Sequence, residues 1–429
     1  MTLGLVVGIL TACGGSQADG GVVTLRFWAF GREGEVVQQL MPEFERRNPG
    51  IRVRVQQIPW TAAHEKLLTA YVGDATPDLA QIGNTWIPEF AALGALEPLD
   101  RWIAASPVVD SAAYFGGIWS TNVIGETVFG IPWYVDTRVI FYRKDILARA
   151  GYRDVPGTWA EWQASMEAVK RELGPGGHAI FLPTNEWAQP YVLGMQAGSP
   201  LLDERGRYGV FSDSAFRRGF EFYVGLFRAG LAPPLGNVEI ANVYQEFARG
   251  RFAMWITGPW NLGEMRRRLP AELQDDWSTA PLPGPSGDSS GVSLAAGSSL
   301  AMFRASRHKE AAWRLVEYLS SSEQQERFYR LTGDLPARTE AWRGTGLADD
   351  PKSHAFWIQL HRVRSVPKVP EVELIATRVL ETAELVIRGG RPVDAALKEL
   401  DRAVARILEK RRWMLDRLAD SSVAKAPAR

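Results

Sequence analysis

The feature that most constrains the fold of this chain is an alternation of strand-like and helix-like segments near its start. Apolar residues cluster or alternate over 22–27, 51–55 and 78–82, which indicates strands. Between these runs, apolar residues recur at helical spacing over 35–47 and 61–73. Strands that are joined by helical crossovers form parallel sheets. The pattern therefore predicts an α/β protein whose chain begins with an open parallel sheet.

The rest of the chain alternates in the same way and is too long for one core. Its 429 residues predict two large domains or lobes, at roughly 100–200 residues each. Further strands are predicted at 137–142 and 252–256, a loop at 281–290, and a disordered tail over 414–429. The other predicted helices span residues 159–173, 213–229, 241–249, 262–269, 311–319, 323–331, 377–388 and 393–412.

Composition excludes several classes of site. Lys plus Arg and Asp plus Glu are both 49, and a formal net charge of zero argues against a nucleic-acid partner. Cys13 is the one cysteine, so the chain forms no internal disulfide and no cysteine zinc cluster. The five histidines lack the spacing of metal ligands. The 16 tryptophans exceed what packing usually requires.

Motifs of common enzymes are missing from the sequence. It contains no phosphate-binding loop, no dinucleotide-binding glycine turn and no nucleophile elbow. A glycosidase needs only two suitably placed carboxylates, which have no sequence signature. The sequence thus favours a binding protein without a cofactor and leaves an enzyme open as the alternative.

Residues 1–21 indicate export and anchoring. Leu3 to Leu10 are apolar or glycine, a run that is too short to span a bilayer but typical of a secretory signal. The sequence LTACG that follows at 10–14 resembles the lipobox of bacterial lipoproteins. This resemblance implies acylation of Cys13, a tether over 14–21, and a location in the periplasm or outside the cell, with the lipid as the only contact with the membrane. The alternative is a buried free cysteine in an N-terminal strand.

Four groups of short segments follow one another along the chain. They are TPDLAQI at 76–82 with GAL at 94–96, GIPWYVD at 130–136 with YRKD at 142–145, FAMW at 252–255 with GPW at 258–260, and GS at 297–298 with GDLPAR at 333–338. This ordered set resembles the solute-binding proteins of sugar ABC importers, the group that includes maltose- and trehalose-binding proteins. The resemblance implies a hinged two-lobe α/β fold, the periplasmic-binding-protein fold, with the ligand between the lobes.

The resemblance also implies how the chain is divided and what it does. Lobe 1 is expected over 22–133 and 295–340, and lobe 2 over 134–294 and 341–413. The protein is then a monomeric receptor that captures a small neutral sugar and delivers it to the permease subunits of the importer. A small α-glucoside of the trehalose or maltose class is expected. A short ligand is favoured over a long chain because aromatic residues that maltodextrin binders often carry after the Val-Pro element are missing.

The chemistry of a sugar suggests which residues bind it. A pyranose has a rim of hydroxyls and an apolar face, so its site needs aromatic plates and bidentate polar groups. The resemblance assigns stacking to Trp260 and hydroxyl binding to Asp136. Tyr134 lies two residues before Asp136 and shares its face in an extended segment. Core packing for Trp260 and hinge packing for Tyr134 are the alternatives.

Other candidates come from the loops of both lobes. The further ligand-binding candidates are Glu33, Asn84, Thr85, Asn185, Trp187, Gly297, Ser298, Asp334 and Arg364, with Glu186 and Glu373 beside them. Glu33 has the alternative of an acid at a helix N-terminus, and Asn84 and Thr85 that of helix caps. The tryptophans assigned to packing instead are Trp60, Trp102, Trp159, Trp162, Trp313 and Trp342.

Three functions therefore remain open from the sequence. The first is a lipid-anchored sugar receptor. The second is an extracytoplasmic carbohydrate-active enzyme that uses paired carboxylates such as Glu33 and Asp136. The third is a receptor for an anion such as glycerol-3-phosphate, which would need a cluster of arginines. The candidates are mainly acids, amides and tryptophans, and this favours the neutral sugar.

Overall fold

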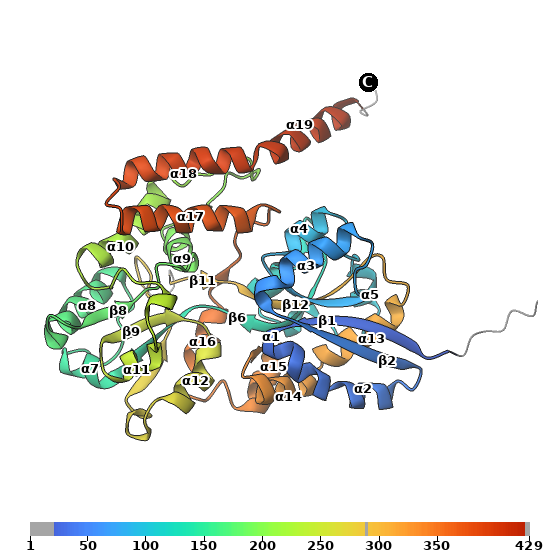
Figure 1. Cartoon of the computed structure of the whole chain (residues 1–429), viewed down its shortest axis with the longest axis horizontal. Coiled ribbons are helices and arrows are strands. Elements are labelled where there is room, and N and C mark those ends of the chain that lie inside the picture. Colours follow the sequence, from blue (N-terminus) through green and yellow to red (C-terminus); the bar gives the residue numbers. More distant parts are fainter. Residues whose placement is uncertain (1–20, 288–290, 425–429) are drawn as a thin grey trace, which may run out of the picture.

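The computed structural model of the protein describes residues 21–287 and 291–424. Two α/β halves lie side by side, each built around its own sheet (Figure 1). We call the half with the six-stranded sheet lobe 1 and the half with the four-stranded sheet lobe 2. The two-lobe α/β fold expected from the sequence is confirmed.

Lobe 1 begins with the parallel unit expected from the sequence. The strand order of its sheet is β13-β6-β12-β3-β1-β2, and β1 pairs in parallel with both β2 and β3. β12 runs antiparallel to β3 and β6, and β13 antiparallel to β6. The strands are β1 (Val23–Phe30), β2 (Ile51–Ile58), β3 (Leu79–Gly83), β6 (Ile131–Asp136), β12 (Ala296–Met302) and β13 (Leu335–Pro336), with a hairpin of β4 (Val123–Ile124) and β5 (Thr127–Val128).

The helices of lobe 1 differ from expectation at one place. The continuous helix predicted over 35–47 is divided, because Pro42 has no backbone N–H to donate inside a helix. The helical elements of lobe 1 are α1 (Gly31–Val36), η1 (Val37–Gln39), α2 (Met41–Arg47), α3 (Trp60–Val72), α4 (Ile87–Ala92), α5 (Asp100–Ala104), η2 (Ser111–Ala113), α6 (Gly116–Ser120), α13 (Lys309–Ser320), α14 (Ser322–Thr332) and α15 (Thr339–Thr345).

Lobe 2 has a mixed sheet of strand order β10-β7-β9-β8. Its strands are β7 (Val139–Arg143), β8 (His178–Phe181), β9 (Phe252–Thr257) and β10 (Trp277–Ala280). Its helical elements are α7 (Lys144–Arg149), α8 (Trp159–Leu173), α9 (Ala188–Gln196), α10 (Ser214–Arg228), η3 (Asn237–Glu239), α11 (Val243–Ala248), α12 (Trp260–Arg268), η4 (Ala271–Leu273), α16 (His354–Leu360), α17 (Val372–Ile387) and α18 (Val393–Ile407). The bounds of α8 are those predicted from its helical periodicity.

The chain passes between the lobes three times. The first crossing follows β6, which stays in the lobe 1 sheet as far as Asp136 rather than ending at 133. The second runs through β11 (Ser293–Leu294), which pairs with β14 (Val363–Arg364). The third follows α15, which packs on α14 and so extends lobe 1 beyond 340. Lobe 1 is thus slightly longer at the first and third crossings than expected.

Aromatic side chains join the lobes beside these crossings. The Phe115 ring lies 5.7 Å from that of Trp342 and 5.4 Å from that of Trp357, measured between centroids. Within lobe 2, Phe356 of α16 packs in turn on Phe141 of β7 at 6.0 Å. The contact between Phe115 and Trp357 therefore joins lobe 1 to lobe 2.

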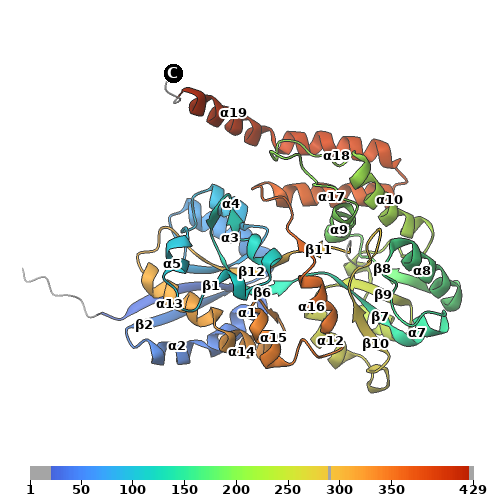
Figure 2. The same ribbon diagram turned by 180° about the vertical axis from the view of Figure 1, so that it is seen from behind.

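The C-terminal segment corrects one prediction. The disordered tail expected over 414–429 is wrong for 414–424, which belong to α19 (Glu409–Ala424), a helix that projects from the body (Figure 2). Arg412 stacks over the Tyr208 ring at 4.8 Å, and Arg207 pairs with Asp416 at 2.8 Å. No glycine or proline interrupts this segment, so the helix continues. Residues 425–429 lie outside the described part of the chain.

The expected signal and anchor, including Cys13, also lie outside the described residues. Within the described ranges, no helix combines the length and the apolar composition that crossing a bilayer requires.

Candidate functional site

A cavity of about 530 Å³ lies between the lobes, within the range of roughly 300–1,000 Å³ that is usual for small-molecule sites. It lies beyond the carboxyl ends of β1, β2 and β3, where ligands bind in open α/β sheets. The predicted residues that line it are Glu33, Asn84, Thr85, Tyr134, Asp136, Trp187, Trp260, Gly297 and Asp334. A larger cavity at the far end of lobe 1 lies away from these residues and is described below.

The lobe 1 wall is organised around the carboxylate of Glu33. The Tyr134 hydroxyl donates to Glu33 Oε1 at 2.9 Å, and Gln81 Nε2 donates to that hydroxyl at 3.0 Å. The indole Nε1 of Trp60 lies 3.3 Å from Glu33 Oε2. Gly31 makes the turn into α1 with a φ of 51°, and a Cβ there would lie 2.6 Å from Cδ1 of Trp60. The backbone therefore fits this arrangement only with glycine at position 31.

Burial sets the protonation of two groups on the same wall. Burial and the negative charge of Glu33 raise the pKa of Asp334 to about 7. The same two causes raise the pKa of the Tyr134 hydroxyl well above its usual value, so that it remains a hydrogen-bond donor. Near neutral pH, this wall therefore offers both donors and acceptors to a polar ligand.

Asp136 lies where the chain leaves lobe 1 and is paired with Arg138. Arg138 Nη1 contacts both carboxylate oxygens of Asp136, at 2.7 and 2.9 Å. Burial raises the pKa of Asp136, and the charge of Arg138 opposes that rise. The Arg138 guanidinium also lies 4.7 Å from the centroid of the Trp260 ring. Arg138 therefore connects the acid of the crossover to the aromatic wall of lobe 2.

Trp260 forms the exposed part of the lobe 2 wall. It is the first residue of α12, and 44% of its surface is exposed. A Cβ on Gly258 would lie 1.9 Å from Cζ3 of the indole, so the ring can take this position only beside glycine. Trp187, just before α9, adds a second aromatic side chain and packs edge-on against Tyr191 at 5.1 Å. Lobe 2 thus presents a largely apolar, aromatic surface to the cavity.

Comparison with known proteins agrees with this arrangement. The family model of the bacterial extracellular solute-binding proteins matches residues 30–326. The chain belongs to this family. The match confirms the resemblance to solute-binding proteins that the ordered motifs indicate.

Two solved structures share the fold of this solute-binding protein. It is similar to the sugar-binding protein MalE from Xanthomonas citri, with a TM-score of 0.89 and 48% identity over 92% of this chain and 99% of that one. An ABC transporter solute-binding protein from Thermotoga lettingae, bound with α-D-tagatose, superposes with a TM-score of 0.75 at 24% identity over 90% of this chain and 100% of that one.

A further binding protein is similar to this chain in sequence over most of its length. The diacetylchitobiose-binding protein DasA of Streptomyces coelicolor is 25% identical over 414 residues, covering 92% of this chain and 94% of its own.

Three predicted ligand residues of the solute-binding protein lie outside the cavity. Asn185 is exposed, and its Oδ1 accepts a hydrogen bond from the backbone N–H of Asn237 at 2.8 Å. Ser298 follows Gly297 on β12 and therefore points to the other face, where its buried hydroxyl donates to the carbonyl of Ile82 at 3.1 Å. Arg364 lies on β14 with an exposed side chain.

Asn84 reaches the cavity but has a structural role as well. Its Nδ2 donates to the Thr121 hydroxyl at 2.8 Å, and its Oδ1 accepts from the Ser299 hydroxyl at 3.0 Å. The amide therefore ties the end of β3 to two neighbouring segments. Its side chain is fixed before any ligand arrives.

Sequence reasoning missed four charged or aromatic lining residues: Arg32, Trp60, Trp86 and Arg138. The sequence predicts a packing role for Trp60, and Trp60 does pack on Phe30 at 5.1 Å, but it also lines the cavity. Trp60 and Trp86 follow the ends of β2 and β3, a position that favours ligand contact. Arg138 continues the spacing of two residues that Tyr134 and Asp136 begin. A position just after a strand could therefore have predicted Trp60 and Trp86 as lining residues, and the two-residue spacing could have predicted Arg138.

Proposed function

We propose that this protein is the receptor of a carbohydrate ABC importer and that it captures a small α-glucoside of the trehalose or maltose class between its lobes. The observation that carries the proposal is the exposed indole of Trp260 opposite buried acids. The apolar face of a pyranose stacks on an indole, and its hydroxyls donate to carboxylates. The 48% identity to a protein described as sugar-binding supports the same ligand class.

A neutral ligand is favoured over a phosphate ester because the two arginines that line the cavity already have partners within the protein. Arg138 already pairs with Asp136, and Arg32 Nη2 donates to the carbonyl of Leu331 at 3.1 Å. Glu33 and Asp334 add negative charge beside them. A phosphate would have to compete with these acids, whereas a sugar hydroxyl can donate to them.

In this proposal the protein acts by binding alone. The sugar draws the two lobes together, and the closed form is recognised by the permease subunits of the importer. The receptor works as a monomer in the periplasm or at the cell exterior, and acylation of Cys13 holds it at the membrane. Replacing Cys13 with Ala is then expected to abolish acyl labelling and release the protein from the membrane fraction. Continued acyl labelling of the variant would contradict the anchor.

Calorimetric titration tests the ligand class. Trehalose, maltose and glycerol-3-phosphate are titrated separately, and the sugar solutions are analysed afterwards for free glucose. We expect one of the disaccharides to bind with a dissociation constant of about 1 μM, near −8 kcal/mol, and to be recovered intact. Binding of glycerol-3-phosphate alone would overturn the sugar proposal. Steady release of glucose would instead identify a carbohydrate-active enzyme.

A further inference from the structure

A cavity larger than the ligand cavity lies outside the ligand site. It has a volume of about 670 Å³. The starts of β1 and β2 lie at the end of lobe 1 that points away from lobe 2 (Figure 1). Val23 and Ile51, the first residues of β1 and β2, line this cavity. It therefore lies at the amino ends of the parallel strands, whereas the ligand cavity lies at their carboxyl ends. We call this cavity the polar-end pocket.

The polar-end pocket is strongly basic although the whole chain has no net charge. The cationic side chains that line it are Arg47, Arg101, Arg307, Lys309 and Arg314, beside His308 and a single acid, Glu310. This concentration of one sign at one end of a neutral protein creates a local positive field.

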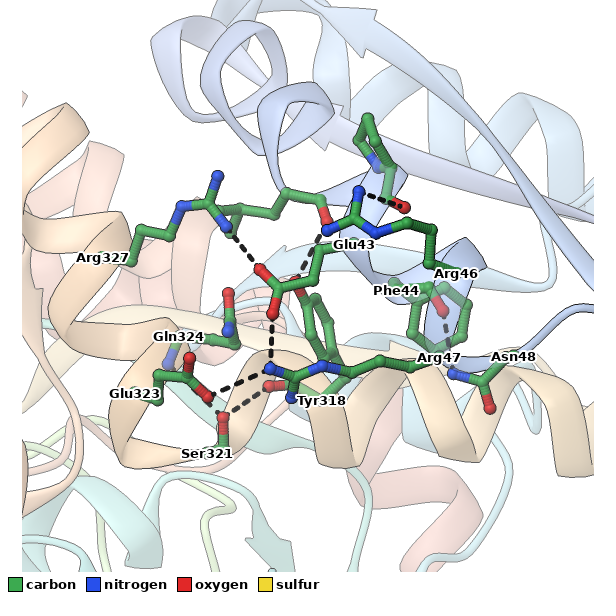
Figure 3. A network of polar contacts seen from close by, with 12 residues as sticks. Glu43, Phe44, Arg46, Arg47, Asn48, Tyr318, Ser321, Glu323, Gln324 and Arg327 are labelled. Atoms are coloured by element: carbon green, nitrogen blue, oxygen red, sulfur yellow. Dashed lines mark hydrogen bonds and ion pairs between the residues drawn. The ribbon is translucent and has the colours of Figure 1, made fainter.

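Neighbouring acids balance part of this charge. Arg101 and Lys309 share one carboxylate, that of Glu97, at 2.9 and 2.8 Å. Arg47 belongs to a network with Glu43 and Glu323, shown in Figure 3, in which Arg327 takes part as well. The positive charge of Arg47 is therefore balanced by nearby acids. The two positive charges of Arg101 and Lys309 are balanced by only one negative charge, that of Glu97.

Two further arginines add charge that has no such partner. Arg307 and Arg314 are both exposed, and neither forms an ion pair with any residue in 21–287 or 291–424. Their guanidinium groups are planar donors that suit the oxygens of a phosphate. The guanidinium groups of Arg307 and Arg314 are therefore available to bind an anion in the pocket.

An aromatic residue marks the same surface. Trp102 lines the pocket and packs on Trp313, with ring centroids 5.9 Å apart, and Arg101 lies 4.8 Å over its ring. Tryptophan is enriched at the level of lipid headgroups, where one side of its ring is apolar and the other is wet. Basic residues together with a half-buried tryptophan are therefore suited to a membrane surface.

We propose that the polar-end pocket docks the protein on the anionic phosphate headgroups of its membrane. In the cell, this docking rests on the lipid anchor proposed above. Cys13 lies ten residues before Val23, and ten residues span at most roughly 35 Å in any conformation. The anchor therefore keeps the start of β1, and the pocket beside it, within roughly 35 Å of the membrane surface. The attraction to the headgroups then acts over about 8 Å at physiological ionic strength. The ligand cavity lies at the opposite edge of the sheet and stays outside this contact.

Flotation with vesicles tests this docking without the anchor. The protein used is the chain from Gly14 onward, which keeps every residue that the structure describes. We expect it to bind vesicles of phosphatidylcholine and phosphatidylglycerol at least about tenfold more tightly than vesicles of phosphatidylcholine alone, and to be released by added salt. Equal binding to both kinds of vesicle would overturn the proposal.

Charge reversal locates the docking surface. The double variant Arg307→Glu/Arg314→Glu is expected to lose the preference for anionic vesicles. The matched control, Arg153→Glu/Arg402→Glu, changes two exposed arginines of lobe 2 and the net charge by the same amount, and it is expected to keep that preference. Both variants are expected to bind sugar as the wild type does, which separates a failure of docking from a failure of the proposed function. Equal loss in both double variants would contradict a role for the pocket.

A soluble anion is distinguished by a separate measurement. Inorganic phosphate is added without vesicles, and the melting temperature is followed. Stabilisation of the wild type but not of Arg307→Glu/Arg314→Glu, together with no vesicle binding, would assign the pocket to a free oxyanion and overturn docking on headgroups.

Discussion

The two walls of the ligand cavity differ in polarity. The lobe 1 wall is polar, and Glu33, Asn84 and Tyr134 are held there by hydrogen bonds within the protein. The lobe 2 wall is largely apolar, and Trp260 leaves 44% of its surface exposed. A polar wall that is already ordered loses little further freedom when a ligand arrives.

This difference suggests that the two lobes contribute differently to sugar binding. The lobe 1 wall selects a pattern of hydroxyls, and the lobe 2 wall gains its contact area only when the lobes close. Because closing draws its energy from contacts absent in the open form, the aromatic wall is expected to decide affinity most strongly. The following variants test this difference between the lobes in order of expected effect.

Trp260→Ala removes the exposed platform of lobe 2. We expect sugar affinity to fall about tenfold to hundredfold, or about 1–3 kcal/mol, because the apolar face of the sugar loses its partner. Calorimetric titration measures the change. Trp413→Ala is the matched control, since that side chain is 54% exposed on α19, away from the cavity. Equal sugar affinities of wild type and Trp260→Ala would show that the aromatic wall of lobe 2 does not contribute to binding.

Asp136→Asn tests the acid at the crossover. The amide keeps the shape, but it loses charge-assisted hydrogen bonds to the sugar and leaves Arg138 with only its longer ion pair, to Glu186 at 4.0 Å. Affinity is expected to fall about tenfold. Asp154→Asn, a change at a carboxylate that is 73% exposed, serves as the control. If Asp136→Asn binds sugar as tightly as the control, Asp136 contributes nothing to recognition.

Asp334→Asn tests the buried charge of the lobe 1 wall through its pH dependence. Folding raises the pKa of Asp334 from 3.8 to about 7 through burial and Glu33, so the folded state keeps a proton that the unfolded state releases. Ionised Asp334 therefore destabilises the protein progressively from about pH 3.8 upward, and the cost is complete above about pH 7. The amide variant should melt a few degrees higher than the wild type above that pH and nearly equally near pH 3.8. A difference that does not change with pH would show that ionisation plays no part.

Arg364→Ala defines the boundary of the site. The side chain is exposed on β14 and does not line the cavity, so affinity is expected to change less than about twofold. A tenfold loss in titration would mean that the closed form recruits this arginine and that the cavity described here is incomplete.

Much of the fold could be predicted because its signals are local. The spacing of apolar residues gave α8 its bounds, and the strand-helix alternation gave the parallel unit of β1, β2 and β3. The helix over 35–47 was wrong because Pro42 divides it, a local rule that was available. The tail was wrong because contacts with Arg207 and Tyr208, two hundred residues away, support α19. The absence of glycine and proline over 409–424 permits a helix, but these distant contacts have no signature within the tail itself.

The lining of the cavity could be predicted at its centre and less well at its edge. Tyr134 and Asp136 share a face of an extended segment, and both line the cavity. Ser298 was misplaced because adjacent strand residues face opposite sides, so only one of Gly297 and Ser298 can reach the cavity. Arg364 was misplaced because its backbone pairs beside the crossover while its side chain points to solvent. Orientation of this kind depends on tertiary pairing.

Small-angle scattering tests the central claim, that one sugar is held between two unlike walls. The radius of gyration is measured without ligand and with the disaccharide that binds most tightly. The account predicts a smaller radius with sugar for the wild type and little change for Trp260→Ala at the same sugar concentration, because the variant lacks the contact that closure creates. A radius that stays constant while titration shows saturation of the wild type would contradict closure of the lobes around the sugar.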